Sequence, residues 1–163
     1  MPRKLIKDGA IIEDTFLLLE NSSEFTSQQD LLIPLALWNE TKPLLKDHKG
    51  KIGIQVLGET EPSEFADDLS AVDLIAIDFP AFKDGRGYSL ARMLRQKFNY
   101  GGELRATGDV LRDQLFYLYR CGFNSFAVRE DRCIEDALNG LKDFSVLYQA
   151  DVHQPKPIYQ RRS

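Results

Sequence analysis

Hydrophobic and polar positions alternate regularly from residue 51 onward. Four short apolar runs have the length of buried strands and lie at residues 52–57, 74–79, 104–107 and 125–129. Four amphipathic stretches with helical spacing follow them, at residues 62–69, 88–98, 110–121 and 133–141. Strands that alternate with helices favour right-handed βαβ crossovers. The pattern therefore predicts an α/β fold with a parallel sheet of about four βα units.

The periodicity does not decide whether this sheet is closed. The same elements fit a half-barrel or an open doubly wound sheet. A chain of 163 residues is too short for a full eightfold βα barrel, which usually needs about 250 residues.

The N-terminal half has a weaker pattern. Asp8 and Gly9 lie between apolar runs, which predicts an N-terminal β-hairpin over residues 4–19 that caps an edge of the domain. The polar residues 21–30 predict a loop, and a short helix is expected near Trp38, with Pro43 unfavourable in its interior.

The C-terminal end of the chain is expected to leave the domain. Residues 144–148 predict a last strand, and residues 151–163 an extended tail. Residues 1–150 then form one α/β domain.

Helix ends are marked by residues that favour caps. Ser89 or Gly87 is expected to cap the helix over residues 88–98, and Asp109 the helix that follows it. Gly122 is suited to the left-handed conformation that ends a helix.

Composition narrows the class of protein. The formal net charge is -4, and the body of the chain has no basic stripe of the kind that binds nucleic acid. No apolar run reaches the roughly 18 residues of a membrane span, and the N-terminus lacks the apolar region of a secretory signal. We therefore expect a cytoplasmic protein that binds neither nucleic acid nor membranes.

The metal-binding and redox residues are few. Two cysteines, Cys121 and Cys133, cannot form a CxxC pair or ligate an iron–sulfur cluster by themselves. The sequence has no iron–sulfur, haem or dinucleotide motif, and no metal signature includes His48 or His153. The nature of any cofactor stays open.

Polar segments directly after the predicted strands are the places to look for a site. The richest includes Asp84, Gly85, Arg86, Gly87 and Arg92. Its glycines permit close backbone approach, the next helix offers free amides, and two guanidinium groups suit an oxyanion such as phosphate, sulfate or sulfite. The alternative is a tight turn whose arginines pair with surface carboxylates.

A second candidate follows the third predicted strand. Asp109 and Arg112 could transfer a proton and bind an anion, respectively. The alternative assigns Asp109 to a helix cap and Arg112 to a solvated helix position. Glu103 and Arg105 are expected to pair with neighbours of opposite charge.

Three blocks of sequence resemble an uncharacterised bacterial family. They are FPAFKDGRGYSLAR at residues 79–92, GELRATGDVLRDQL at residues 102–115 and RCGF at residues 120–123. Members of that family are commonly encoded beside assimilatory sulfite reductase genes and are labelled "oxidoreductase probably involved in sulfite reduction". The resemblance implies a role in reducing sulfite to sulfide for cysteine biosynthesis. It brings no established catalytic residues.

Two hypotheses of function follow. In the first, the protein is a noncatalytic accessory that docks on sulfite reductase or its electron donor. In the second, it is an oxidoreductase or a small-oxyanion-binding enzyme, whose pocket joins Asp84, Arg86 and Arg92 to Asp109 and Arg112. An exposed apolar patch would favour the first hypothesis, and a concave basic pocket the second.

Overall fold

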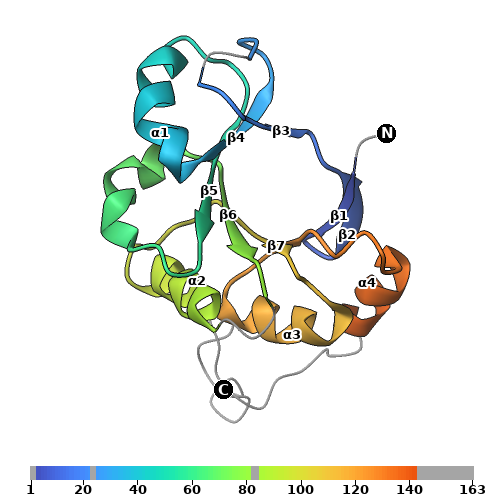
Figure 1. Cartoon of the computed structure of the whole chain (residues 1–163). Coiled ribbons are helices and arrows are strands. Elements are labelled where there is room, and N and C mark those ends of the chain that lie inside the picture. The colour runs from blue at the N-terminus through green and yellow to red at the C-terminus, as the bar shows by residue number, and fades with distance from the viewer. Residues whose placement is uncertain (1–2, 23–24, 82–84, 143–163) are drawn as a thin grey trace, which may run out of the picture.

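The computed structural model of the chain describes residues 3–22, 25–81 and 85–142. Within these residues the strands form one curled eight-stranded sheet in the order β2-β1-β8-β7-β6-β5-β4-β3 (Figure 1). The strands are β1 (Lys4–Lys7), β2 (Ala10–Glu13), β3 (Phe16–Leu18), β4 (Asp30–Pro34), β5 (Ile52–Leu57), β6 (Leu74–Phe79), β7 (Glu103–Gly108) and β8 (Ser125–Phe126). The α-helices are α1 (Leu35–Thr41), α2 (Arg86–Gln96), α3 (Arg112–Cys121) and α4 (Ile134–Lys142), with 3₁₀ turns η1 (Lys42–Leu45), η2 (Pro62–Glu64) and η3 (Ala66–Ala71).

The parallel core of the sheet is confirmed. Strand β6 pairs in parallel with β5 and β7, and β7 pairs in parallel with β8. The sheet as a whole is mixed and not only parallel, because the N-terminal hairpin joins it and β1 pairs antiparallel with both β2 and β8. The predicted loop over residues 21–30 also ends in an unpredicted strand, β4, which pairs in parallel with β5.

The N-terminal hairpin forms, but it is shorter than predicted. Asp8 and Gly9 connect β1 to β2 with φ values of 51° and 81°, as a two-residue turn with two left-handed residues requires. The hairpin ends at Glu13. The apolar residues that follow form β3, which pairs in parallel with β4 at the opposite edge of the sheet.

Asp14 and Thr15 explain why the sheet curls. They are the only residues between β2 and β3, which are the two edge strands of the sheet. The step from Glu13 to Phe16 spans at most about 11 Å, so the two edges must approach each other. This connection produces the half-barrel shape seen in Figure 1 and excludes the open doubly wound sheet.

The two faces of the sheet are packed differently. Ile75 and Ile77 of β6 point outward into the main core, beneath the helices that cover the outer face (Figure 1). Leu74 and Ala76 alternate with them and form a smaller inner cluster with Leu32. All of these side chains are buried, so neither face of β6 is left to solvent.

Several helix boundaries differ from the prediction. The 3₁₀ turns η2 and η3 replace the first predicted helix, between β5 and β6. Gly85, instead of Gly87 or Ser89, precedes α2, and Leu111 precedes α3, so Asp109 is not its cap. Gly122 ends α3 with φ 118°, as predicted.

Other predictions concern the ends of the chain. The last strand at residues 144–148 and the tail at residues 151–163 lie outside the described residues. Among the helices that are described, none has the length and apolar character needed to cross a membrane.

Candidate functional site

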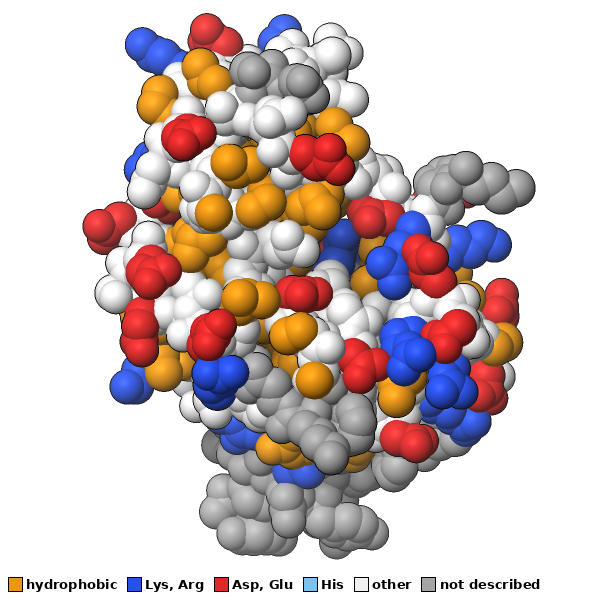
Figure 2. Space-filling model, viewed as in Figure 1, with side chains coloured by type: hydrophobic (Ala, Val, Ile, Leu, Met, Phe, Trp, Pro, Cys, Tyr) orange, Lys and Arg blue, Asp and Glu red, His pale blue; other side chains and the backbone are white. Residues whose placement is uncertain are grey.

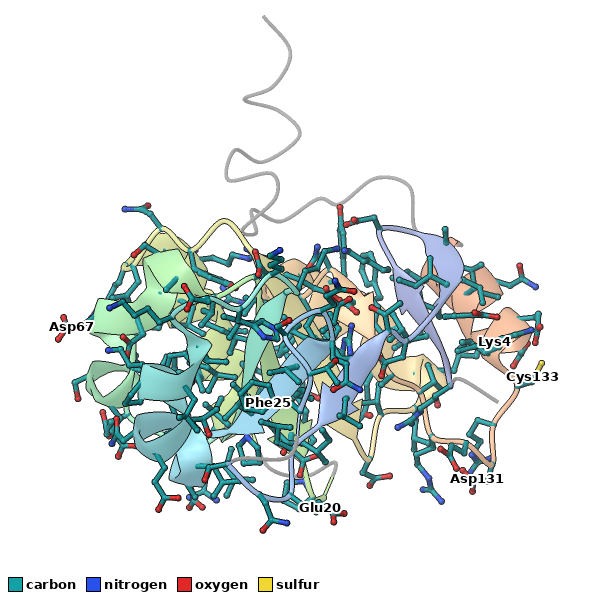
Figure 3. The ribbon with its side chains drawn as sticks, turned by 90° about the horizontal axis from the view of Figure 1, so that it is seen from above. Lys4, Glu20, Phe25, Asp67, Asp131 and Cys133 are labelled. Atoms are coloured by element: carbon teal, nitrogen blue, oxygen red, sulfur yellow. The ribbon has the colours of Figure 1, made fainter. Side chains whose placement is uncertain are left out.

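The carboxyl ends of the parallel strands open onto one face of the molecule, here called the carboxyl-end face. Glu20, which follows β3, and Asp131, which follows β8, lie along the same edge in Figure 3. In α/β sheets of this kind ligands bind at that end of the strands. The face has an apolar half at β3–β5 and a basic half at β8.

The apolar half contains an apolar patch, formed by Pro34, Leu35, Ala36 and Leu57 at one pocket and by Leu18 of the adjacent strand β3, which pairs with Leu32 of β4. Leu18 ends β3 and is 47% exposed, and Leu57 ends β5 and is 43% exposed. Figure 2 shows hydrophobic side chains gathered over β3, β4 and α1 on this face. Four members of the patch line a shallow pocket of about 270 Å³, which is also lined by Gln55, Val56, Thr60 and Asp78, whereas Leu18 is not among its lining residues.

The polar groups at the edge of this pocket bond to neighbouring residues. The Asp78 carboxylate accepts a hydrogen bond from Thr107 Oγ1 at 3.0 Å. Thr60 Oγ1 accepts one from the Leu57 amide at 3.2 Å. These bonds leave an apolar surface with a polar margin, which is the usual anatomy of a protein-binding patch.

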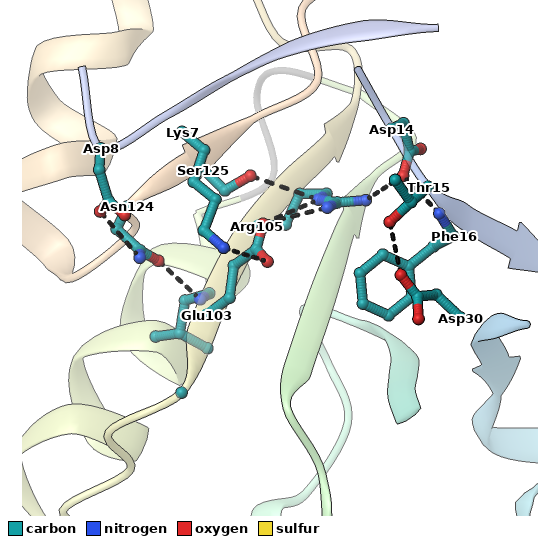
Figure 4. A network of polar contacts seen from close by, with 12 residues as sticks. Lys7, Asp8, Asp14, Thr15, Phe16, Asp30, Glu103, Arg105, Asn124 and Ser125 are labelled. Carbon is teal, nitrogen blue, oxygen red and sulfur yellow. Dashed lines mark hydrogen bonds and ion pairs between the residues drawn. The ribbon is translucent and has the colours of Figure 1, made fainter. Parts of the chain in front are cut away.

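Behind this face, a buried ion network occupies the inside of the curled sheet (Figure 4). Arg105 of β7 is 3% exposed and donates to Glu103 Oε1 at 3.0 Å and to Asp14 Oδ1 at 3.1 Å. Its guanidinium also reaches Ser125 Oγ at 3.3 Å and lies 5.2 Å from the centre of the Phe16 ring. Arg105 therefore ties the middle of the sheet to the Asp14–Thr15 connection between its edges.

The network confirms that Glu103 and Arg105 pair with groups of opposite charge. Glu103 accepts from Arg105 in the same strand and lies 3.5 Å from Lys7 Nζ of β1. Buried charges of this kind are retained only when paired, because desolvating a lone ion is costly. These charges hold the sheet together, and none of them is exposed on the carboxyl-end face.

Asp30, the first residue of β4, binds the Thr15 end of the Asp14–Thr15 connection. Its carboxylate accepts from Thr15 Oγ1 at 2.6 Å and from the Lys51 amide at 3.0 Å. Burial pushes the pKa of Asp30 upward, but the hydrogen bonds from Thr15 and Lys51 outweigh it and hold the pKa below its usual value. Its preferred state is therefore the carboxylate that anchors β3 to β4.

The basic half of the face contains a second pocket, of about 300 Å³, here called the basic pocket. It is lined by Arg3, Lys4, Val128, Arg129, Glu130, Arg132 and Ile134. Arg129 donates to Asp131 at 2.8 Å and to Asp109 at 3.0 Å, and hydrogen bonds to these two carboxylates raise its pKa. Asp109 therefore binds the guanidinium of Arg129 and does not cap α3.

The predicted oxyanion residues are engaged in separate places. Arg86 Nη1 lies 3.0 Å from Glu59 Oε2, and Arg92 Nη2 lies 3.6 Å from Cys121 Sγ of α3. Arg112 pairs with Asp136 of α4 at 2.9 Å. The described contacts direct these arginines toward three different elements, so a joint oxyanion site stays a prediction.

The two glycines of the predicted loop differ in their surroundings. Gly85 precedes α2 at its N-terminus. Gly87 is buried, and a Cβ atom there would meet the Phe79 ring at 2.5 Å. Gly87 is therefore needed for α2 to pack on β6. Asp84 lies outside the described residues.

The sequence indicates only part of the carboxyl-end face. Segment 129–132 is one of the polar segments that follow the predicted strands, but nothing in the sequence places Arg3 and Lys4 beside it. That contact depends on the antiparallel pairing of β1 with β8. The apolar patch was missed because the residues of β3 were assigned to the N-terminal hairpin and β4 was not predicted. The apolar run Phe16–Leu18 was the available signal.

Metal ligands are not clustered on this face. No group of three or more His, Cys, Asp or Glu side chains that could hold a metal ion occurs among the described residues.

Comparison with known proteins places the chain in a family. No curated protein matches it. A family model described as "Bacterial protein of unknown function (DUF934)" matches residues 53–159, which include strands β5 to β8 and all three blocks of the sequence resemblance. Since this match covers more than half of the chain, the protein belongs to that bacterial family.

Proposed function

We propose that this protein is a noncatalytic accessory of assimilatory sulfite reduction, acting in sulfur assimilation and cysteine biosynthesis. In this proposal it docks on sulfite reductase or on its electron donor through the apolar patch. The biological setting rests on the sequence resemblance. The docking role rests on one observation, which is the exposure of Leu18 at the end of β3 and of Leu57 at the end of β5, on the two strands that flank β4.

The exposed leucines favour a partner on energetic grounds. Burying a leucine side chain contributes about 1.5–3 kcal/mol, so two of them can supply much of the affinity of a small interface. The patch is shallow and flanked by hydrogen-bonded polar groups, which suits a protein surface better than a small substrate.

A second candidate function is an oxidoreductase or small-oxyanion-binding enzyme with its site at the carboxyl ends of the strands. The basic pocket at the end of β8 favours this candidate. A redox reaction would also require a bound cofactor. An absorbance spectrum of the purified protein discriminates the two candidates, because a flavin or other cofactor band would favour the enzyme.

Deleting the gene tests the biological setting. We expect the deletion strain to grow poorly on sulfate or sulfite and normally on sulfide or cysteine, because the defect lies before sulfide is formed. The measurement is the growth rate on each compound as the sole sulfur source, with the complemented strain as control. Normal growth of the deletion strain on sulfite would contradict the proposal, and rescue by sulfite would place the function upstream.

A further inference from the structure

The basic pocket is built by segments that lie far apart in the sequence. Arg3 and Lys4 come from the start of β1, whereas Arg129 and Arg132 follow β8. Figure 3 shows Lys4 and Asp131 on the same side of the molecule, although more than a hundred residues separate them. We propose that this pocket binds a small inorganic oxyanion of the sulfite, sulfate and phosphate class. This binding requires no partner protein and is independent of the docking role.

Charge is the first argument for an anion. Four cationic side chains and one carboxylate, Glu130, line the pocket, although the whole chain has a formal net charge of -4. Three of these groups have anchoring contacts. Arg3 Nη2 donates to the Val128 carbonyl at 2.9 Å and Arg3 Nε lies 3.7 Å from Glu130, while Arg129 is held by two carboxylates. These contacts fix two guanidinium groups at the walls of the pocket.

Lys4 and Arg132 supply the positive charge of the pocket that is not engaged in an ion pair within the described residues. Neither makes an ion pair with any of the residues that the structure describes. Like charges that line one pocket repel each other, and a bound anion converts that repulsion into attraction. The forked guanidinium of Arg132 suits two oxygens of a tetrahedral or pyramidal oxyanion, and the lysine adds a point charge.

The start of α4 adds hydrogen-bond donors. Ile134, its first residue, lines the pocket, and the first amide groups of a helix have no partner within the helix. The acidic residues of this first turn are drawn elsewhere, because Asp136 pairs with Arg112 and Glu135 lies 3.5 Å from Cys133 Sγ. The start of α4 therefore lies at the same cavity as the cationic side chains.

The pocket is open to solvent and is larger than a small ion. Its volume is about 300 Å³. An oxyanion can therefore enter with part of its hydration shell, and bridging waters can complete contacts that the side chains do not reach. We expect affinity in the millimolar range that falls as ionic strength rises, because the pocket is open to solvent.

Anion titration of the full chain tests the proposal. Sulfite, sulfate and phosphate are titrated at constant ionic strength with chloride as the counter-anion, and amide shifts are followed by NMR alongside calorimetry. We expect saturable shifts in segment 128–134. The double variant Lys4→Gln/Arg132→Gln should bind at least about tenfold more weakly, since each lost charge-assisted bond removes severalfold in affinity.

Matched variants separate the pocket from general charge effects. Lys46→Gln/Lys49→Gln removes the same charge from two exposed lysines elsewhere and should bind like the wild type. Arg86→Ala and Arg92→Ala should also bind normally. Loss of binding in either of those two variants would instead place the anion at the start of α2. Absence of saturable shifts at millimolar anion, or equal weakening by both double variants, would overturn the proposal. Sulfur-source growth does not enter this test, so its failure and that of the accessory role are distinguishable.

Discussion

Replacing Arg105 by methionine is expected to lower the free energy of unfolding by about 3–5 kcal/mol. Arg105 is 3% exposed, and its removal leaves the buried Glu103 carboxylate and Asp14 without their main cation. It also removes the bond between β7 and the connection that brings the edges of the sheet together. Urea unfolding followed by circular dichroism at neutral pH measures the change.

Two further variants show whether buried charge is the cause. Arg112→Met removes an exposed ion pair with Asp136 and should change stability by less than about 1 kcal/mol. Arg105→Met combined with Glu103→Gln and Asp14→Asn should recover part of the loss, because no buried charge is then left without a partner. Equal stability of Arg105→Met and Arg112→Met would contradict the role assigned to the network.

Gly108→Ala is expected to destabilise the protein by about 2–3 kcal/mol or more. Gly108 ends β7 with φ +90°, a conformation that an L-residue adopts only with strain. A Cβ atom at this position would also collide with the Phe79 carbonyl and lie 2.8 Å from Asp78 Oδ1. The strands β6 and β7 would have to separate at the carboxyl-end face, next to the Thr107–Asp78 hydrogen bond. Thermal unfolding of the purified variant measures the loss.

Gly101→Ala is the control for this substitution. A Cβ atom at Gly101 meets nothing within 4 Å, and its φ is not in the positive range. Alanine there should leave the melting temperature almost unchanged or raise it slightly, because it restricts the unfolded chain. A Gly108→Ala variant as stable as Gly101→Ala would mean that the backbone at the end of β7 differs from the one described.

The parallel core of the fold could be predicted because its signals are local. Strand β6 is a continuous apolar run, which is typical of a strand buried on both faces, and the amphipathic pattern over residues 88–98 matches α2 to within two residues at each end. The Asp8–Gly9 turn likewise depends on two adjacent residues.

The rest of the fold depends on contacts that leave no local pattern. Strand β3 has only three residues, and β4 ends in a proline, so neither is typical of a predicted strand. The pairing of β1 with β8 joins segments more than a hundred residues apart. Without these pairings the curl of the sheet, and with it the choice of a half-barrel, could not be inferred.

The candidate site was predictable only in its general position. Polar segments after parallel strands directed attention to the carboxyl ends, and residues of segment 129–132 line a pocket there. The roles of single residues could not be inferred, because charged side chains choose partners across elements. Asp109 illustrates this, since its preference for helix caps is overridden by a hydrogen bond to Arg129.

The proposed docking of the sulfite-reducing machinery on the apolar patch can be tested by substitution. Leu18→Glu/Leu57→Glu places two charges in the patch, and Leu44→Glu places one on η1, where Leu44 is 53% exposed and belongs to no part of the patch. All three substitutions fall on exposed side chains, so each variant should stay folded, which circular dichroism checks.

The decisive measurement is the affinity of the purified chain for sulfite reductase and for its electron donor from the same bacterium. We expect the wild type and Leu44→Glu to bind one of these proteins equally well. Leu18→Glu/Leu57→Glu should bind it at least about a hundredfold more weakly, because the complex loses two leucines that the partner would bury and has to desolvate two charges. Failure of the wild type to bind either protein, or equal binding by all three chains, would contradict the account.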